Sequence, residues 1–394
     1  MKPFMKIGAF LMAVMIAVTA VGRTPISLNK EWAYKTDKQE LSIGVYIYSL
    51  RTAYSQAQNY ASELEDYDET TEAWLDLEIT DDDGEKAIAR EWIKSEAEKI
   101  CLTYLALDEQ VEALGIDLSG ATMDSADETA QEYWDMGPYA SYGYYMPMSD
   151  ELEPYGVSYD SFAYCTTEFD TKYSAVFDKL YGEGGEKEVT DSEFETFFKE
   201  NYTDYKYFSV NLYESTTDEA EGTTTDVALS DADVNKITGQ LDGYADEINK
   251  GTSYEDVINK YMEAEGLDTD PSTSGIEIVE DSTLGDEIKS ALDELETNKA
   301  TTIKVGEGNT AVYYLVFKGD ITDDVESYVY EETNRSQLLA NMKQDEFADY
   351  MDELAGKVDC EKNQSVLDQY KPELFFVKPE ETTAAEDDSE SSAS

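Results

Sequence analysis

The side chains that could do chemistry in this 394-residue chain include no histidine. This excludes Ser-His-Asp and Cys-His nucleophilic catalysis, imidazole metal sites and acid–base catalysis by histidine. The three cysteines, Cys101, Cys165 and Cys360, lie far apart and form no CxxC motif. The sequence therefore predicts neither a disulfide framework nor a zinc site. Cys101 falls on the apolar stripe of an expected helix, where a small buried hydrophobe is the simpler interpretation.

One acidic run, Asp81-Asp82-Asp83-Gly84, has the composition of a calcium loop. An EF-hand needs carboxylates at its first and twelfth positions, but Ile79 and Arg90 stand there. We therefore expect a solvated turn and no metal. The sequence also has no GxxxxGK[ST] loop for nucleotide phosphates. No cofactor is expected.

The charge of the chain limits its partners. Its 88 acidic and 29 basic residues give a formal net charge of −59. Nucleic acid is excluded as a partner because phosphate binding requires patches of lysine and arginine. Docking on anionic lipid is disfavoured for the same reason. With 41% hydrophobic residues, including 30 Tyr and 13 Phe, most of the chain should be globular.

The N-terminal segment predicts export. Lys2 and Lys6 precede an uncharged run over residues 7–22, which is followed by Arg23. A basic start and a short apolar stretch are typical of a signal peptide, whereas a spanning helix needs about 20 apolar residues. We expect residues 1–22 to be a signal peptide or an N-terminal anchor, with a cleavage site near Ala20. No cysteine follows, so a lipoprotein is not expected, and the protein should be extracytoplasmic.

Helical periodicity dominates the residues before 200. Apolar residues recur at alternating four and three positions over 43–64 and again over 85–114, which predicts two long amphipathic helices that pack on each other or on a third. A further helix is expected from Ser158 to about residue 180. Thr190-Asp-Ser-Glu193 then forms a capping box at the start of another helix.

Between these helices, residues 133–164 are rich in Tyr, Met, Gly and Pro. Aromatic and methionine side chains make adaptable contacts of low specificity. Two interpretations stay open for this segment: an irregular connection packed against the helices, or a surface that contacts a client polypeptide. The candidate contact residues are Tyr142, Tyr144, Tyr145 and Met146.

The period changes at residue 205, where a smaller α+β unit is predicted. Its elements are expected in the order β-α-α-β-α-β-β, with a polar loop over 215–226 that does not pack and a final hairpin around Gly306-Glu-Gly308-Asn309. Helical periodicity returns at 324–356, and this helix should contact the helices at 43–64 or 85–114. The whole chain is therefore expected to be α+β, with this unit inserted into a mostly helical lobe.

Three stretches of sequence resemble the PrsA/SurA group of extracytoplasmic foldases. The first is Trp92–Leu118, whose run through Leu105-Ala-Leu-Asp-Glu109 into Leu114-Gly-Ile-Asp-Leu118 is similar to the long helix of SurA-like and trigger-factor-like chaperone domains. The second runs from Gly156-Val-Ser-Tyr-Asp-Ser-Phe162 to Tyr202. The third, Ile248-Asn-Lys-Gly-Thr-Ser-Tyr254, is similar to the helix–Gly–aromatic pattern of parvulin-type proline isomerases.

The resemblance implies a domain organisation. It predicts a SurA-like chaperone lobe over 35–200, a parvulin-like domain over 201–322, and a C-terminal helix over 323–377 that completes the lobe. An acidic, disordered tail is expected over 378–394.

The resemblance also implies site residues. Tyr207 and Tyr313 fall where parvulins place two histidines that face each other beneath the bound proline, and Leu284 and Ile288 fall in the proline pocket. A tyrosine with a pKa of about 10 suits no proton transfer at neutral pH. The favoured interpretation of the two tyrosines is that they are ordinary core residues, so isomerase activity should be weak or absent.

The function expected from this resemblance is an ATP-independent chaperone that binds unfolded or newly exported polypeptides. Two alternatives stay open: an active peptidyl-prolyl isomerase, and a non-enzymatic surface-binding protein.

Overall fold

The computed structural model describes residues 31–118, 120–218 and 223–377. The expected signal segment and the expected acidic tail both lie outside these ranges. The chain has the α+β fold class that the sequence predicts. It forms two compact units: unit 1 comprises the chain up to Glu188 and again from Lys343, and unit 2 comprises Val189–Met342. The expected boundaries, 200 and 322, lie inside unit 2.

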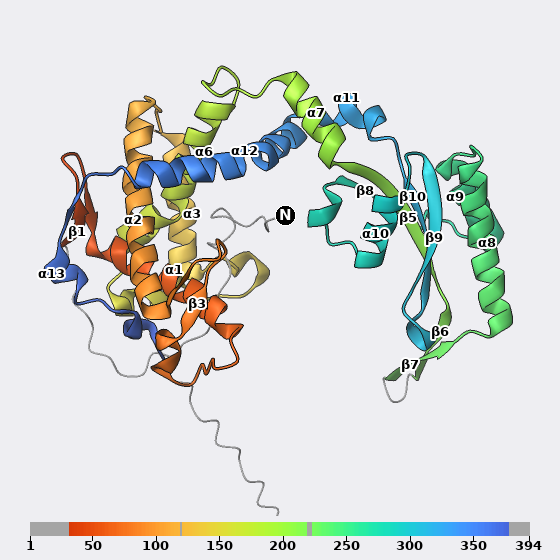
Figure 1. Cartoon of the computed structure of the whole chain (residues 1–394), viewed down its shortest axis with the longest axis horizontal. Helices are drawn as coiled ribbons and strands as arrows, with labels where there is room; N and C mark the ends of the chain where they lie inside the picture. Colours follow the sequence, from red (N-terminus) through yellow and green to blue (C-terminus); the bar gives the residue numbers. More distant parts are fainter. Residues whose placement is uncertain (1–30, 119, 219–222, 378–394) are drawn as a thin grey trace, which may run out of the picture. The chain divides into compact units, whose positions relative to one another are not determined.

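Unit 1 is built on two long helices, α1 (Ile43–Ser62) and α2 (Ala89–Ala113), which pack on each other as their periodicity predicts (Figure 1). The side chain of Ser42 caps α1 by accepting a hydrogen bond from the backbone N–H of Val45. The α2 helix begins four residues later than expected, because residues 86–88 form a strand.

Shorter helices surround this pair. They are α3 (Ala121–Met136), α4 (Met148–Leu152), α5 (Tyr159–Cys165), α6 (Thr167–Tyr181) and α13 (Gln364–Leu367). The prediction of a single helix over 158–180 is wrong, because the segment forms two helices, α5 and α6, with a break between them. At Thr166 the backbone turns to φ −119° and ψ −101°, outside the helical region.

Two small sheets complete unit 1. In one, β1 (Trp32–Lys35) lies between β2 (Glu40–Ser42) and β11 (Glu361–Lys362). In the other, β3 (Glu78–Thr80) pairs with β4 (Lys86–Ile88). The expected acidic turn joins β3 to β4. The Asp81 carboxylate closes it by accepting hydrogen bonds from the backbone N–H groups of Asp83 (3.1 Å) and Glu85 (2.8 Å).

The C-terminal helical segment is interrupted. It consists of a short α11 (Val325–Val329) in unit 2 and α12 (Glu332–Ala355), which continues into unit 1. The predicted contact with the helix at 85–114 is confirmed, since Tyr350 of α12 donates to the side chain of Gln110 in α2 over 3.1 Å. Phe347 is fully buried against the rings of Tyr173 and Phe177 from α6.

Unit 2 begins with α7 (Asp191–Asn201), which starts at the predicted capping box of Thr190 and Glu193. A four-stranded antiparallel sheet follows, in the order β8-β5-β10-β9. Its strands are β5 (Thr203–Asn211), β8 (Thr273–Glu277), β9 (Lys299–Val305) and β10 (Val312–Lys318). The turn between β9 and β10 falls at the predicted hairpin signature.

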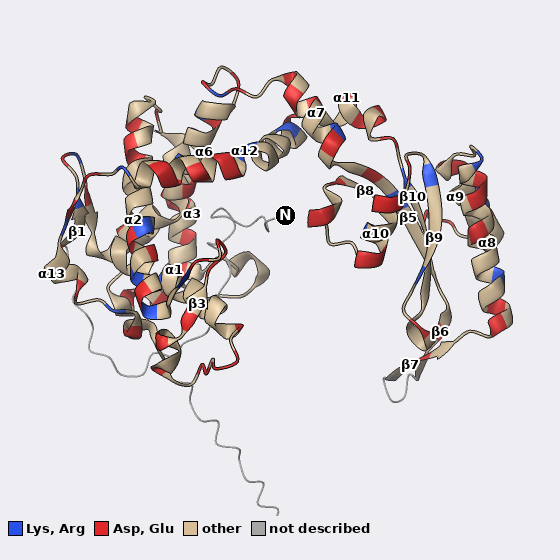
Figure 2. Ribbon diagram, in the orientation of Figure 1, with Lys and Arg blue, Asp and Glu red and all other residues tan. Residues whose placement is uncertain are grey.

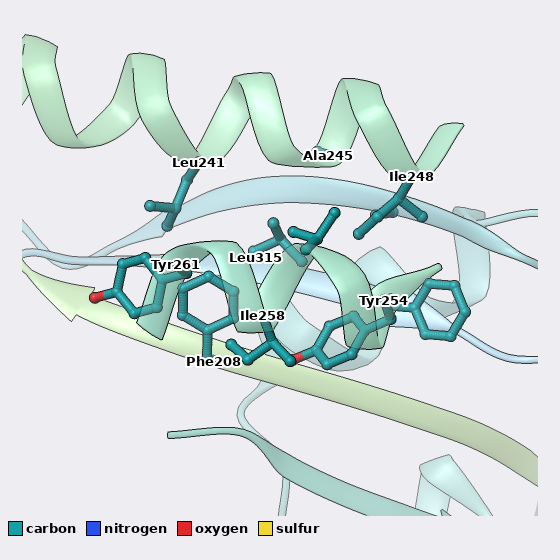
Figure 3. Close-up of a cluster of buried hydrophobic side chains, with 11 residues drawn as sticks. Phe208, Leu241, Ala245, Ile248, Tyr254, Ile258, Tyr261 and Leu315 are labelled. Carbon is teal, nitrogen blue, oxygen red and sulfur yellow. The ribbon is translucent and has the colours of Figure 1, made fainter. Parts of the chain in front are cut away.

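Helices cover both faces of this sheet (Figure 1). One face packs against α8 (Asp231–Asn249) and α9 (Tyr254–Glu265), and the other against α10 (Asp286–Glu294). Figure 3 shows the first interface, where Leu241 and Ile248 of α8 meet Phe208 and Leu315 of the sheet. The expected order of elements is present, with one addition.

That addition is a hairpin. The prediction of an unpacked polar loop over 215–226 is wrong, because β6 (Tyr213–Asp218) pairs with β7 (Thr223–Ala228). Its Thr-rich strands satisfy their backbone groups by pairing with each other, although their side chains face solvent and provide little apolar burial. The sequence therefore gave no hydrophobic signal for these strands.

Carboxylates are spread over the helices and loops of each unit, with far fewer lysines and arginines between them (Figure 2). Among the residues that the structure describes, no helix is both long and apolar enough to cross a membrane.

Candidate functional site

The two tyrosines expected to face each other do not meet. In the antiparallel register, Tyr207 of β5 lies opposite Val316, whereas Tyr313 of β10 lies opposite Val210. Side chains of directly paired residues share a face, and successive residues alternate between faces. Tyr207 consequently packs in the cluster on the α10 face, and Tyr313 packs against the cluster on the α8/α9 face. The expectation of a facing Tyr207–Tyr313 pair is therefore wrong.

The neighbour of Tyr207 on the α10 face is Tyr314, with ring centroids 6.0 Å apart. On its other side, Tyr207 stacks on Tyr205 at 6.2 Å and an interplanar angle of 15°. The Tyr205 hydroxyl donates to the carboxylate of Glu277. Burial, then this bond to Glu277, raises the pKa of Tyr205, and burial, then the nearby Tyr207, raises the pKa of Tyr314. Both phenols therefore stay protonated at neutral pH.

Tyr313 has a structural role on the opposite face. Its hydroxyl donates to the carboxylate of Asp242 over 2.7 Å and lies 3.0 Å from the hydroxyl of Thr302. Thr302 donates to the same carboxylate oxygen over 2.6 Å. The three side chains tie β9 and β10 to α8. Burial of the phenol raises the pKa of Tyr313, and the carboxylate of Asp242 raises it further.

The two residues expected in the proline pocket, Leu284 and Ile288, lie together between α10 and the sheet. Ile288 is buried and Leu284 is partly buried, and both pack in the cluster that contains Tyr205 and Val316. The apolar surface of Ile288 is therefore covered by the sheet of its own unit. This places both residues in the core between α10 and the sheet.

The expected contact residues of the Tyr/Met segment are on the surface of unit 1. Tyr142, Tyr144 and Tyr145 are 78%, 67% and 69% exposed. Met146 and Met136, the last residue of α3, are also exposed. These five residues, called the Tyr/Met patch below, form an uncovered apolar surface. Exposed groups of large apolar side chains often mark interaction sites.

The loop that carries the patch has a defined structure. The backbone N–H of Met146 donates to the carbonyl of Met136 over 3.0 Å, which closes the loop at its base. Gly137 adopts φ +90°, and a Cβ there would collide with the backbone of Met146. Only glycine fits this close approach. Ala140–Tyr142 form one 3₁₀ turn, which ends at Gly143 in the left-handed conformation. The rings are thus held out by an ordered backbone.

The rest of the aromatic segment is packed. Trp134 is buried in α3, with its ring 5.4 Å from that of Phe162. The ends of the segment over 133–164 therefore belong to the core, as the first interpretation predicts, and its middle is exposed. Contact of this middle part with a client polypeptide stays a prediction.

Sequence reasoning missed a cavity of about 510 Å³ in unit 1, between α1, α2 and the β3–β4 turn. It is lined by aromatic rings, including Tyr60 and Trp92, and by many carboxylates. One signal was present in the sequence: Trp92, Glu96 and Lys99 recur at spacings of four and three and therefore share one face of α2.

None of the three cysteines has the lowered pKa of a reactive thiol, because burial raises the pKa of each. Cys101 and Cys165 are buried, and burial raises the pKa of the Cys101 thiol to about 12. A reactive cysteine needs a lowered pKa and access to solvent. Within the described ranges, no group of three or more Cys, Asp or Glu side chains is placed to hold a metal ion.

Comparisons with known proteins give similarity to solved structures only. The sequence matches no described protein family, and no curated protein matches it. Among solved structures, the foldase protein PrsA from Streptococcus pneumoniae is similar over 75% of this chain and 99% of its own, with 14% sequence identity and a TM-score of 0.33. The two chains are alike in fold at most, so the function is inferred below from the residues of this chain alone.

Proposed function

We propose that this chain is an exported, ATP-independent chaperone that holds unfolded or newly translocated polypeptides on unit 1. The single observation that supports this most is the Tyr/Met patch, an apolar surface displayed on a closed loop. Unfolded polypeptides expose apolar side chains, and burying these against the patch lowers the free energy of the bound state. Binding an unfolded chain shields it from aggregation without any nucleotide.

The chemistry of the patch fits a client of no fixed sequence. Tyrosine offers a large apolar ring with a polar hydroxyl and only two rotatable side-chain bonds, so little entropy is lost on binding. Methionine adapts its shape to irregular partners. Because the hydrogen bond between Met146 and Met136 closes the backbone of the loop and Gly137 permits the close approach, the rings are presented without a prior ordering step.

We further propose that the sheet of unit 2 is a parvulin-like domain with weak or no isomerase activity. The chain has no histidine. In addition, the two tyrosines that stand in for the parvulin histidines lie on opposite faces of the sheet. Catalysis requires stronger binding of the twisted amide than of the planar one, and these tyrosines cannot donate to one amide together.

The holding activity is tested by aggregation suppression. Protein from residue 31 onward should suppress the aggregation of a chemically unfolded client, in the absence of nucleotide, at a roughly stoichiometric ratio. A variant with Tyr142, Tyr144 and Tyr145 replaced by serine should suppress it poorly, whereas Tyr330→Ser, an exposed tyrosine of unit 2, should suppress it normally. Full suppression by the triple variant would refute the role of the patch, and no suppression by the unsubstituted protein would refute the function.

A further inference from the structure

The cavity of unit 1 combines negative charge with aromatic walls. Carboxylates come from the β3–β4 turn (81–83 and Glu85), from Glu91 and Glu96 of α2, and from Asp352 of α12. The two lysines that line it, Lys86 and Lys99, are already paired: Lys99 lies 2.9 Å from Asp352, and Lys86 lies 3.4 Å from Glu78. The cavity therefore has an excess of negative charge.

Aromatic rings hold these carboxylates in place. The indole N–H of Trp92 donates to Asp81 over 3.2 Å, and the hydroxyl of Tyr60 donates to Asp82 over 2.8 Å. The two rings meet edge to face at 5.5 Å, and Phe169 forms another part of the wall. Aromatic rings attract cations placed over their faces, most strongly when the cation is desolvated. Fixed carboxylates beside aromatic rings form a receptor for an organic cation.

Two of the carboxylates, Glu96 and Asp352, share Lys99 as their nearby cation and are only partly compensated by it. Burial raises the pKa of Glu96; Lys99 opposes this, and the charges of Asp352, Asp81 and Asp83 add to it. The Oδ1 atom of Asp352 is buried and has no hydrogen-bond donor in the described part of the chain. A bound cation would stabilise the charged form of both groups.

We propose that this cavity binds the cationic side chain, above all the guanidinium of arginine, of a polypeptide held by unit 1. The inference rests on the proposed function, because the client polypeptide supplies the cation. A volume of about 510 Å³ is ample for one long side chain with water around it. Arginine fits better than lysine because its planar group stacks on aromatic rings and donates in a fork to carboxylates. Unit 1 thus selects clients that place a basic residue among apolar ones.

The test uses three labelled peptides of the same apolar sequence with arginine, citrulline or alanine at the centre. Citrulline keeps the shape of the side chain but carries no charge and has a carbonyl oxygen in place of one terminal nitrogen of the guanidinium. Fluorescence anisotropy at low salt should show the arginine peptide binding about tenfold tighter than the citrulline peptide. Raising the salt concentration to about 0.5 M should reduce this difference because the charges are screened.

Variants locate the effect. Glu96→Gln with Asp352→Asn should abolish the preference for arginine, and Glu96→Gln alone should weaken it. The single variant is expected to fold, because glutamine keeps the shape and removes an only partly compensated charge. Glu128→Gln, the same change at an exposed position of α3 outside the cavity, should bind all three peptides as the unsubstituted protein does.

Each outcome separates this inference from the proposed function. Equal binding of the three peptides would overturn the basic-residue site and leave the holding function intact. A preference for arginine that survives both carboxylate substitutions would place the site elsewhere and also overturn it. Binding of N-acetylarginine amide as tightly as the peptide would show that the cation is a free small molecule. If no peptide binds and no aggregation is suppressed, the proposed function itself is wrong.

Discussion

Replacing Tyr142, Tyr144 and Tyr145 by serine should separate client binding from folding stability. About a third or less of each side chain is buried. Fully burying a large apolar side chain is worth roughly 1.5–3 kcal/mol, so the buried part of each ring contributes at most about 1 kcal/mol. Single substitutions away from packed features usually change stability within about 0.5 kcal/mol. The three changes together should therefore cost less than about 2 kcal/mol.

The expected loss of binding is larger. Aromatic side chains that anchor an interface often contribute more than about 1 kcal/mol each, and each 1.4 kcal/mol is about tenfold in affinity. Three tyrosines acting together should change the affinity for an unfolded client by about a hundredfold or more. The assay is anisotropy of a labelled, permanently unfolded client, with thermal unfolding followed by circular dichroism on the same samples.

The control variant, Tyr330→Ser, removes an exposed tyrosine from unit 2 and should leave the affinity unchanged. For a unit of this size a loss of 1 kcal/mol lowers the Tm by roughly 2–4 °C. A fall in Tm well beyond 8 °C in the triple variant, with client affinity preserved, would refute the reasoning. It would show that the three rings stabilise unit 1 and do not contact the client.

The other predictions concern the loop, the core, catalysis and pH. Gly137→Ala should lower the Tm and weaken client binding together, because the new methyl group collides with Met146 at the base of the loop. Leu315→Ala, in the fully buried cluster of Figure 3, should cost about 2–5 kcal/mol in urea unfolding. An Xaa-Pro peptide assay should show isomerisation near the uncatalysed rate, and Tyr207→Phe should not change it; robust catalysis lost on this substitution would contradict the proposal. Since the pKa of Glu96 is raised in the folded state, its carboxylate destabilises the fold as the pH rises above the ordinary glutamate value. Glu96→Gln should then stabilise the protein at pH 7 but not below about pH 4.

Local sequence signals were sufficient to predict most of the helices and the four-stranded sheet. The α1 and α2 stripes, the capping box at Thr190 and the β9–β10 hairpin are all encoded locally, within a few turns or residues. The break at Thr166 was not predictable in this way, because apolar residues continue in helical spacing through it into α6. The β6–β7 hairpin was missed because its strands pair without burying an apolar face.

The site was predicted less well than the fold. Exposure of the Tyr/Met patch depends on a loop whose closure by Met136 and Met146 is a backbone contact that composition does not reveal. The cavity combines residues from α1 and α2 with Asp352 of α12, which lies more than 200 positions further along the sequence. Periodicity can group residues on one helix, such as Trp92 and Glu96, but it cannot bring Asp352 to them. Only tertiary packing does so.

The two faces of the unit 2 sheet explain why the tyrosine pair was misassigned. The residues of β10 from Val312 to Phe317 are all apolar or aromatic, so they show no alternation that would mark one face as buried and the other as exposed. A shift of one residue moves every side chain to the opposite face. Tyr314, one position after the expected residue, is therefore the neighbour of Tyr207. A prolyl ring entering beside these two would have to displace Ile288 or Val316, which are buried in the same cluster. Unpacking such a core side chain costs several kcal/mol, and this cost argues against efficient isomerisation at this sheet independently of the missing histidines.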